Sequence, residues 1–385
     1  MRIALVTETF PPEINGVAMT LERLALAMGE AGHSVEVIRP RQRGTPGNGR
    51  HPYRELEVGA VALPGYEELN LGLPVATRLY HHWRQQQPDV VYLATEGPLG
   101  AAALAVCHAR GILPVSGFHT NFQEYVRHYQ LRWLELLMRT YLRFLHNSTL
   151  RTFGPSRDLL GRLRREGFHR LRLLERGVDT RLFRPDRRGA DLRRKWGAPA
   201  DGPVFLYVGR LAAEKNIGLL AALWPTLQVT RPDARLVLVG DGPLRPELEE
   251  QLPQAHFAGT RNGEDLAVHY ASADYFLFPS LTETYGNVVA EAMASGLGVL
   301  AFRYAAAAQL IGDGRNGWTV PTGDATGFRK QAAVLAGLSP AAARPVRAAA
   351  RETALSRSWE GVFRRFEGEL QSAVEERRAE ARQQA

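Results

Sequence analysis

Two cations that follow one predicted strand are the first residues whose types and spacing suggest chemistry. In GRLAAEKN, residues 209–216, Arg210 and Lys215 come after the apolar run Val204–Val208 and before a predicted helix. An arginine fork and a lysine point charge together suit a diphosphate. The alternative is a pair of solvated cations, which are common on protein surfaces. Their position at a strand-to-helix crossover favours a phosphate site.

A second polar group lies in FPSLTETYGNVVAEAMASG, residues 278–296, where a loop leads from a strand into a helix. Glu283 precedes the predicted helix and Glu291 lies within it, so both carboxylates are available to one ligand. Gly286 and Asn287 mark the helix N-terminus, whose free amide groups and dipole attract anions. The alternative places one glutamate on the helix surface and gives the other a capping role. The two cations upstream favour a shared binding site.

The elements that must position these residues alternate between strand and helix in both halves of the chain. The first half has short apolar strands such as Arg2–Thr7 and Asp89–Ala94, and the second half restarts the pattern at Val204–Val208 and Tyr275–Phe278. Strands separated by helices predict parallel βαβ units. We therefore predict an α/β fold with two Rossmann-like, doubly wound domains that face each other across a cleft, with ligands at the carboxyl ends of the strands.

The domain boundary is predicted from composition. The segment FRPDRRGADLRRKWGAPADGP, which starts at Phe183, is dense in proline, glycine and charge and is typical of a linker. We expect an N-terminal domain at 1–195 and a C-terminal domain at 200–356. The amphipathic C-terminal helix, 357–385, is expected to pack back on the first domain.

The bulk composition limits the class of protein. The chain has 385 residues and a formal net charge of +8, so anionic partners are expected. Its single cysteine, Cys107, excludes an intramolecular disulfide and is predicted to be a buried structural thiol rather than a reactive one. The first residues turn charged at Glu8, too early for a signal peptide, and no apolar run reaches the ~20 residues of a membrane span. A cytoplasmic location is expected, with the option of peripheral attachment to the inner face of the membrane.

Several motifs taken together resemble a known family. These are the E-x7-E pattern after an FPS-type strand, VGRL…EK, VGDGP at Val239–Pro243, TETFPPEINGV, SGFHTNF and GTRNGEDLAVHYASAD. They are similar to the retaining glycosyltransferases of the GT-B fold, family 4, over essentially the whole chain. The resemblance implies transfer of a hexose, of mannose or glucose type, from a UDP- or GDP-sugar to the hydroxyl of a lipid-linked or saccharide acceptor.

The resemblance also implies roles for individual residues. Arg210 and Lys215 are expected to stabilise the departing diphosphate. Glu283 contacts the transferred sugar, and Glu291 binds the ribose hydroxyls. His119 lies beside the donor sugar, although a lone histidine is more often a core or surface residue. The donor-binding positions are Gly16, Gly209, Gly259, Thr260, Arg261, Thr284, Tyr285, Gly286, Asn287 and Glu291. Asn15 stands where many members of the family carry glycine, and its role stays open.

No cofactor or metal is expected. The chain has no Asp-x-Asp motif of the kind that holds a metal in many other transferases. Two cations and a helix N-terminus supply the same stabilisation of a leaving diphosphate. Retention with departure and attack on one face requires no protein nucleophile.

An arginine-rich region at 130–176 concerns the acceptor side. Arginines such as Arg139 and Arg143 are interleaved with Trp133, Leu137, Tyr141 and Leu145. A basic amphipathic helix lies well on an anionic membrane surface. The alternative is a helix whose apolar side faces the core and whose cations are solvated.

Three rival functions remain at this point. A sugar-nucleotide epimerase of related fold would bind the same donor. A nucleic-acid-binding protein would explain the basic charge, but the sequence shows neither an aromatic-basic platform nor a helix-turn-helix signature, so no nucleic-acid partner is expected. A membrane-surface scaffold that kept the fold without the activity is the third.

Overall fold

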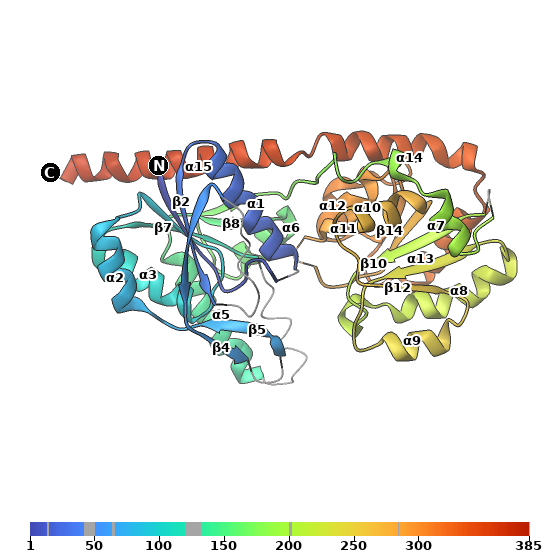
Figure 1. Ribbon diagram of the computed structural model, residues 1–385, viewed down its shortest axis with the longest axis horizontal. Coiled ribbons are helices and arrows are strands. Elements are labelled where there is room, and N and C mark those ends of the chain that lie inside the picture. Colours follow the sequence, from blue (N-terminus) through green and yellow to red (C-terminus); the bar gives the residue numbers. More distant parts are fainter. Residues whose placement is uncertain are drawn as a thin grey trace. The chain divides into compact units, whose positions relative to one another are not determined.

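The computed structural model describes residues 1–13, 15–41, 51–63, 66–119, 132–199, 202–283 and 285–384. The chain forms two compact units, and each is described by itself (Figure 1). Unit 1 comprises Met1–Glu175 and Val362–Ala385, and unit 2 comprises Arg176–Gly361. Both units are α/β domains built on a parallel sheet, so the predicted pair of Rossmann-like folds is confirmed.

The sheet of unit 1 has the strand order β3-β2-β1-β6-β7-β8-β9, with neighbouring strands parallel. Its strands are rich in apolar residues because helices cover both faces. The strands are β1 (Arg2–Val6), β2 (Ser34–Pro40), β3 (Tyr53–Val58), β6 (Val90–Leu93), β7 (Leu113–Gly117), β8 (Thr152–Gly154) and β9 (Leu171–Leu173), with a separate hairpin of β4 (Ala60–Leu63) and β5 (Tyr66–Gly72). The helices are α1 (Gly16–Glu30), α2 (Ala76–Gln85), α3 (Pro98–Arg110), α5 (Arg132–Asn147), α6 (Arg157–Arg165) and α15 (Trp359–Gln384).

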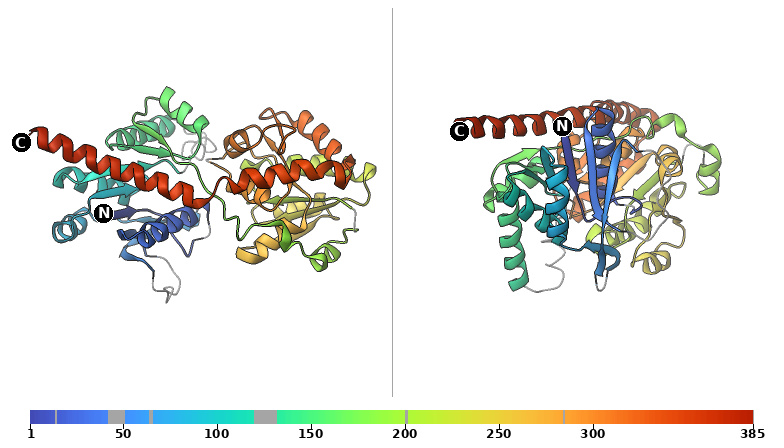
Figure 2. Two further views of the ribbon diagram at one scale, coloured as in Figure 1. Left: turned by 90° about the horizontal axis from the view of Figure 1, so that it is seen from above. Right: turned by 60° about the vertical axis from the view of Figure 1, so that its left-hand side comes forward.

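The C-terminal helix α15 belongs mainly to unit 1 although it lies at the far end of the sequence. Figure 2 shows it as the long red helix that runs to the C-terminus. Its Phe366 packs edge-on against Tyr92 of β6 and Phe153 of β8, with ring centroids 5.1 and 5.4 Å apart. Arg151 is bonded to the Glu369 carboxylate at 2.5 Å. Aromatic packing and a partly buried ion pair therefore fix this helix to the strands of unit 1.

The opposite face of the unit 1 sheet holds a cluster that includes Val6, Leu93, Leu99 and Cys107. Cys107 is buried, as predicted, and burial raises the pKa of its thiol. No helix in the described part of the chain combines the length and the apolar character needed to cross a bilayer.

The sheet of unit 2 has the strand order β12-β11-β10-β13-β14-β15, again parallel. Its central strand β10 is buried at every position. The strands are β10 (Val204–Val208), β11 (Arg235–Val239), β12 (His256–Gly259), β13 (Tyr275–Phe278), β14 (Gly298–Phe302) and β15 (Trp318–Val320). The helices are α7 (Ala190–Lys195), α8 (Gly218–Thr230), α9 (Arg245–Gln251), α10 (Gly263–Ser272), α11 (Asn287–Ala294), α12 (Ala305–Leu310), α13 (Ala325–Gly337) and α14 (Pro340–Leu355), with short 3-10 turns η1 (Pro185–Arg187) and η2 (Ala213–Lys215).

Each sheet has a point at which the strand order reverses. In unit 1 the chain moves outward from β1 to β2 and β3, then returns to β6 on the other side of β1. In unit 2 it moves outward from β10 to β11 and β12, then returns to β13 on the other side of β10. Ligands of open α/β sheets bind at the carboxyl ends of the strands beside such a point. A ligand site in unit 2 is therefore expected at the loops after β10 and β13.

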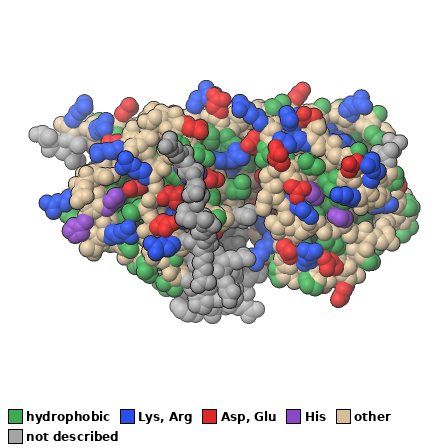
Figure 3. Space-filling view, in the orientation of Figure 1, with side chains coloured by type: hydrophobic (Ala, Val, Ile, Leu, Met, Phe, Trp, Pro, Cys, Tyr) green, Lys and Arg blue, Asp and Glu red, His purple; other side chains and the backbone are tan. Residues whose placement is uncertain are grey.

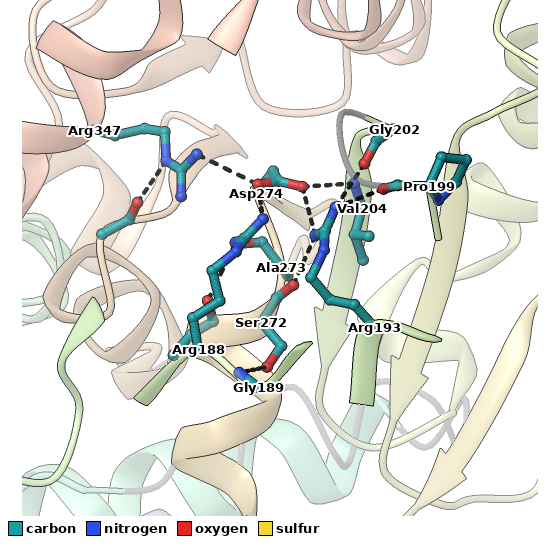
Figure 4. A network of polar contacts seen from close by, with 12 residues as sticks. Arg188, Gly189, Arg193, Pro199, Gly202, Val204, Ser272, Ala273, Asp274 and Arg347 are labelled. Atoms are coloured by element: carbon teal, nitrogen blue, oxygen red, sulfur yellow. Dashed lines mark hydrogen bonds and ion pairs between the residues drawn. The ribbon is translucent and has the colours of Figure 1, made fainter. Parts of the chain in front are cut away.

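The charged segment predicted as a linker is folded instead. It forms η1 and α7, and it belongs to unit 2, so the units divide at Glu175/Arg176 rather than near residues 195–200. The reason is an ion-pair network around Asp274, the residue before β13 (Figure 4). Arg188 and Arg193 from this segment lie 2.8 and 2.9 Å from its carboxylate, and Arg347 of α14 lies 3.4 Å away.

The Asp274 carboxylate is ionised in this setting. Its oxygen also accepts a hydrogen bond from the Val204 amide at 2.9 Å, where β10 begins. Burial opposes the charge, but Arg188, Arg193, this amide and Arg347 together hold the pKa of Asp274 below its ordinary value of 3.8. Asp274 thus joins the segment before β10, the start of the central strand and α14.

The substitution Asp274→Asn is expected to destabilise unit 2 by about 3–5 kcal/mol, since it leaves the buried Arg193 and the partly buried Arg188 and Arg347 without their counter-ion. Urea unfolding monitored by tryptophan fluorescence measures the change. Because the folded pKa lies below the unfolded one, the wild-type contribution is present above the unfolded pKa and is lost as pH falls through the folded pKa. The variant should lack this acid-dependent loss.

The matched control is Asp191→Asn. Asp191 pairs with Arg194 on the surface of α7, where its side chain is 82% exposed, and such pairs contribute less than about 1 kcal/mol. Equal unfolding midpoints for the two variants would contradict the role given to Asp274.

Candidate functional site

The loops after β10 and β13 are joined by an ion pair between predicted site residues. Lys215, at the end of η2, places its Nζ 2.6 Å from the Glu283 Oε1 atom. Ser280 donates a hydrogen bond to the same carboxylate oxygen at 2.9 Å. The side chains of Lys215 and Glu283 are 22% and 14% exposed, so the pair is shielded but open to a ligand. The structure therefore brings these two residues together at the reversal point of the sheet.

Further hydrogen bonds fix the two loops to each other. The Thr282 hydroxyl donates to the Glu214 carbonyl at 3.1 Å, and the Asn216 side-chain amide donates to the Pro279 carbonyl at 3.2 Å. Asn216 ends η2 with a positive φ of 52°, a conformation that asparagine tolerates better than most residues. The sequence reading did not assign Ser280, Thr282 or Asn216. The available signal was the presence of short polar side chains in the loops that come after β10 and β13.

Arg210 lies in the same loop but is not part of this ion pair. Its side chain is exposed and has no hydrogen-bond or ion-pair partner among the described residues. Its backbone carbonyl accepts a hydrogen bond from the buried Tyr207 hydroxyl at 3.0 Å. Burial keeps that phenol protonated by raising the pKa of Tyr207 well above its ordinary value. The backbone at Arg210 is thus held while its guanidinium stays open to solvent.

The helix α11 begins beside Glu283 with no side-chain cap. Gly286, at the N-cap, has φ 88°, a left-handed conformation that glycine adopts at little cost. The first turn of the helix carries no acidic residue. The side-chain oxygen Oδ1 of Asn287 is buried and has no hydrogen-bond partner among the residues described. Both observations fit a site for an anion or a hydroxyl-bearing ligand at this helix end.

Glu291 lies in the middle of α11 and is oriented by a tyrosine. The Tyr270 hydroxyl donates to its Oε2 atom at 3.0 Å. Tyr270 is fully buried, and burial followed by the nearby Glu291 charge raises the pKa of this tyrosine well above its ordinary value. The phenol is therefore a permanent donor that holds one carboxylate oxygen.

The other positions predicted in unit 2 differ in what they offer. The Tyr285 side chain is buried, and its hydroxyl donates to the Arg176 carbonyl at 3.3 Å. Only the backbone of Tyr285 is therefore available to bind a ligand. Thr284 lies outside the described residues. Gly209 follows β10. Gly259, Thr260 and Arg261 lie at the carboxyl end of β12, two strands from β10 in the sheet order, with Arg261 bonded to the Ala258 carbonyl and Asp265.

Gly16 of unit 1 is the first residue of α1 and is exposed. The preceding Asn15 is the N-cap, and its Oδ1 atom accepts hydrogen bonds from the Val17 and Ala18 amides at 3.0 and 2.8 Å. Its amide group donates to the Thr9 hydroxyl at 2.7 Å. The open role of Asn15 is therefore a helix cap that also fixes the loop before Gly16.

His119 of unit 1 is buried two residues after β7. Its Nε2 atom lies 2.5 Å from the hydroxyl of Tyr92 on β6. A side chain at Gly117 would collide with both partners, because a Cβ there would lie 2.3 Å from the Tyr92 hydroxyl and 2.5 Å from Nε2. The imidazole is thus held at the carboxyl end of β7 by Tyr92 of the neighbouring strand β6.

Glu8, which the sequence reading did not assign, lies at the reversal point of unit 1. Its amide donates to the Thr95 hydroxyl at 2.7 Å, which joins the loops after β1 and β6. Its carboxylate accepts hydrogen bonds from the Gly72 amide and, at 3.0 Å, from the Leu99 amide in the first turn of α3. Burial raises the pKa of Glu8 to about 7, against the opposing effect of these amides. The motif TETF was visible in the sequence, but nothing local showed that this glutamate is buried.

Charge on the face seen in Figure 3 is mixed and is not gathered into one patch. On the face seen in Figure 3, basic and acidic side chains alternate over both units. A nucleic-acid-binding surface is instead expected to show a basic patch or stripe. This face therefore lends no support to the nucleic-acid hypothesis.

Comparisons with known proteins agree with this geometry. The family described as Glycosyltransferase Family 4 matches residues 14–182, and the family described as Glycosyl transferases group 1 matches residues 202–337. The GDP-mannose-dependent alpha-mannosyltransferase of Mycolicibacterium smegmatis is 34% identical over 97% of this chain and 98% of its own. The alpha-monoglucosyldiacylglycerol synthase of Streptococcus pneumoniae is 25% identical over 78% of this chain and 71% of its own.

A solved structure shows the same fold. The sucrose-phosphate synthase from Thermosynechococcus elongatus has a TM-score of 0.80 and 22% identity, with 96% of this chain and 98% of that chain covered. The parallel sheets, the polar loops at the reversal point of unit 2 and these similarities lead to one conclusion. The chain belongs to the family 4 glycosyltransferases of the GT-B fold.

Proposed function

We propose that this glycosyltransferase moves mannose from GDP-mannose to the hydroxyl of a lipid-linked or saccharide acceptor, with retention of anomeric configuration and without a metal. The observation that carries the proposal is the Lys215–Glu283 ion pair at the reversal point of unit 2, beside the uncapped start of α11. The similarity to the GDP-mannose-dependent alpha-mannosyltransferase of M. smegmatis supports GDP-mannose as the donor. The similarity to the alpha-monoglucosyldiacylglycerol synthase of S. pneumoniae and the character of α5 support the acceptor class.

The main role proposed for Lys215, Arg210 and the start of α11 is electrostatic stabilisation of the leaving diphosphate. Negative charge grows on the β-phosphate as the glycosidic bond breaks, so positive groups already in place lower the barrier. Lys215 and Arg210 supply two charges from one loop, and the amides at the start of α11 supply the helix dipole. Lys215 is held in advance by Glu283, which means that little reorganisation is needed when the donor arrives.

Glu283 is assigned to the sugar rather than to nucleophilic attack. Its Oε1 atom is already bonded to Lys215 and Ser280, which lowers its availability as a nucleophile. The leaving phosphate then takes the acceptor proton while departure and attack occur on one face. Glu291, held by Tyr270, binds the ribose hydroxyls, and the Asn287 side-chain oxygen offers a further acceptor for a hydroxyl.

The helix α5 supports a second role, binding to an anionic membrane. Tyr141 and Leu145 belong to the protein interior, as the core-facing alternative expected. Leu136, Leu137 and Phe144 are nevertheless 67%, 59% and 67% exposed. The neighbouring Arg139 and Arg143 are also exposed.

An apolar strip with cations beside it fits the boundary between the headgroups and acyl chains of anionic lipids. The side chains of residues 130–135 lie outside those described. Because a lipid-linked acceptor is presented at that boundary, the α5 strip would bring the enzyme to its substrate.

Donor identity is tested by thermal shift with GDP-mannose, UDP-glucose and ADP-glucose. GDP-mannose at 100 times its Kd should stabilise the protein by about 2.7 kcal/mol, and the other two should do so less at the same concentration.

Transfer to an acceptor should proceed at an unchanged rate in EDTA, and NMR should show the α-anomer as the product. Formation of an epimer of the donor in the absence of an acceptor would contradict the proposal. So would the absence of a thermal shift with all three nucleotide sugars.

The variants Lys215→Ala and Arg210→Ala should each lower kcat by about 10²–10³-fold, the usual cost of removing one preorganised charge from a transition state. Initial rates of transfer from GDP-mannose measure the effect. Lys330→Ala on α13 is the matched control, because Lys330 is exposed and has no ion-pair partner in the described structure. Wild-type kcat in both site variants would refute the assigned mechanism.

The double variant Leu137→Ser, Phe144→Ser should bind vesicles with 30% anionic lipid at least about tenfold more weakly, since it removes two apolar side chains from the interface. Cosedimentation measures binding. Val229→Ser on α8 makes the same change at a side chain that is 81% exposed in unit 2, and it should bind as wild type does. Equal binding by all three proteins would exclude the α5 strip as the membrane contact.

A further inference from the structure

A cavity of about 310 Å³ lies in unit 2 at the end of the sheet opposite the loops of the proposed donor site. Its lining includes Asp274 and Tyr275, where β13 begins, and Ser295, just after α11. The site residues Lys215 and Glu283 follow the carboxyl ends of β10 and β13 and are not among its lining. Its volume is at the small end of the range for ligand pockets, which suits a small ion or metabolite rather than a sugar nucleotide.

The cavity carries more positive than negative charge. Arg188, Arg193 and Arg347 line it and converge on the single carboxylate of Asp274, as Figure 4 shows. Arg231, which also lines it, is paired separately with Asp233 at 2.9 Å. The three arginines around one aspartate therefore leave two positive charges uncompensated by the described lining.

The three guanidinium groups are not equally occupied. Arg193 is almost fully used, since its two terminal nitrogens bond to Asp274 and to the carbonyls of Ser272, Pro199 and Gly202. Arg188 is also used, because one terminal nitrogen donates to the Ala271 and Ala273 carbonyls and the other to Asp274. Arg347 donates its Nε to the Gly296 carbonyl at 2.7 Å but meets Asp274 at only 3.4 Å. Its side chain is 25% exposed. Burial lowers the pKa of Arg347, which means that its charge is poorly solvated and gains from a further counter-ion.

Two hydroxyl groups complete the lining. The Ser295 hydroxyl is buried, in a residue that is 1% exposed, and has no hydrogen-bond partner among the described residues. Buried hydroxyl groups usually have a hydrogen-bond partner, so this one is available to bond to a ligand in the cavity. Tyr275 has no side-chain hydrogen bond in the described structure, and burial raises the pKa of its phenol to about 12, which keeps it a donor.

From this arrangement we infer that the cavity binds a phosphate group, either as the free ion or on a small phosphate monoester. A phosphate dianion matches the two uncompensated charges, and its tetrahedral oxygens suit an arginine fork together with hydroxyl donors. Arg347 and the hydroxyl groups of Ser295 and Tyr275 are the groups that hold it. This site is separate from the proposed donor site, which lies at the other end of the strands.

The test is thermal unfolding of the full chain, titrated with inorganic phosphate or glycerol 3-phosphate at ionic strength held constant with NaCl. The Arg210→Ala, Lys215→Ala double variant serves as background, because it removes the cations that are expected to bind phosphate at the donor site. A phosphate compound at ten times its Kd should raise the melting temperature by about 3–5 °C. Tighter binding of the monoester assigns the site to a metabolite, and tighter binding of the ion assigns it to free phosphate.

Two variants locate the binding. Arg347→Gln should abolish the shift, and Ser295→Ala, a milder change that preserves the fold, should weaken the affinity by about 2–10-fold. Arg329→Gln on the exposed side of α13 is the control and should respond as the background does. The inference is overturned if neither compound exceeds the NaCl effect, or if Arg347→Gln and Ser295→Ala both keep the full shift. Neither result bears on sugar transfer, so the proposed function can fail or stand separately.

Discussion

The reversal of strand order between β10 and β13 is the constraint on which the candidate site of unit 2 depends. The strands added after β10 extend the sheet to one side and those added after β13 extend it to the other, so the two loops that begin at the centre meet there. Their sequences place a lysine in one and a glutamate in the other, and these join at 2.6 Å. Hydrogen bonds from Asn216 and Thr282 hold the same two loops together. A ligand placed between them therefore meets charges whose positions the sheet has already determined.

The helix α11 runs between the two ends of the unit 2 sheet, and its two termini differ in their charged neighbours. This helix begins at the Lys215–Glu283 pair and ends at Ser295, and eight residues span about 12 Å. Its positive end is left uncapped where a diphosphate is proposed to bind. At its negative end, Arg351 and Arg347 donate to the Ala294 and Gly296 carbonyls, an arrangement that complements the helix dipole.

Much of this could be predicted from the sequence because the strands of unit 2 are apolar runs and the candidate site residues lie in the loops and the helix that come after them. Lys215, Glu283 and Glu291 were predicted from their types and positions, and their roles from the resemblance to the family. The segment with Arg188 and Arg193 was misread as a linker, since its counter-ion, Asp274, lies about eighty residues later in the chain. No local pattern reveals a pairing over that distance.

Burial was also hard to predict where the sequence is amphipathic or polar. The spacing in α5 showed a helix with an apolar side, but only the fold shows that Leu145 is covered while Phe144 is exposed. Glu8 resembles an ordinary loop carboxylate until the Leu99 amide is placed against it. In each case the deciding partner comes from an element distant in the sequence.

The position of α11 has a consequence for how the two ends of the sheet could communicate. Ser295 and Arg347 lie on neighbouring helices, because α11 packs against α14, and an anion bound to both would tie these helices together. The Ser295 amide is bonded to the Glu291 carbonyl at 2.9 Å, so the cavity and the proposed ribose contact share one backbone. If α11 can take two positions and an anion binds more tightly in one of them, the bound anion would change the affinity for the donor. The donor would then change the affinity for the anion by the same factor. An anion that binds both positions equally would stabilise unit 2 without altering the donor site. Among the proposed donor contacts on α11, Glu291 lies nearest in sequence to Ser295, one helical turn before it.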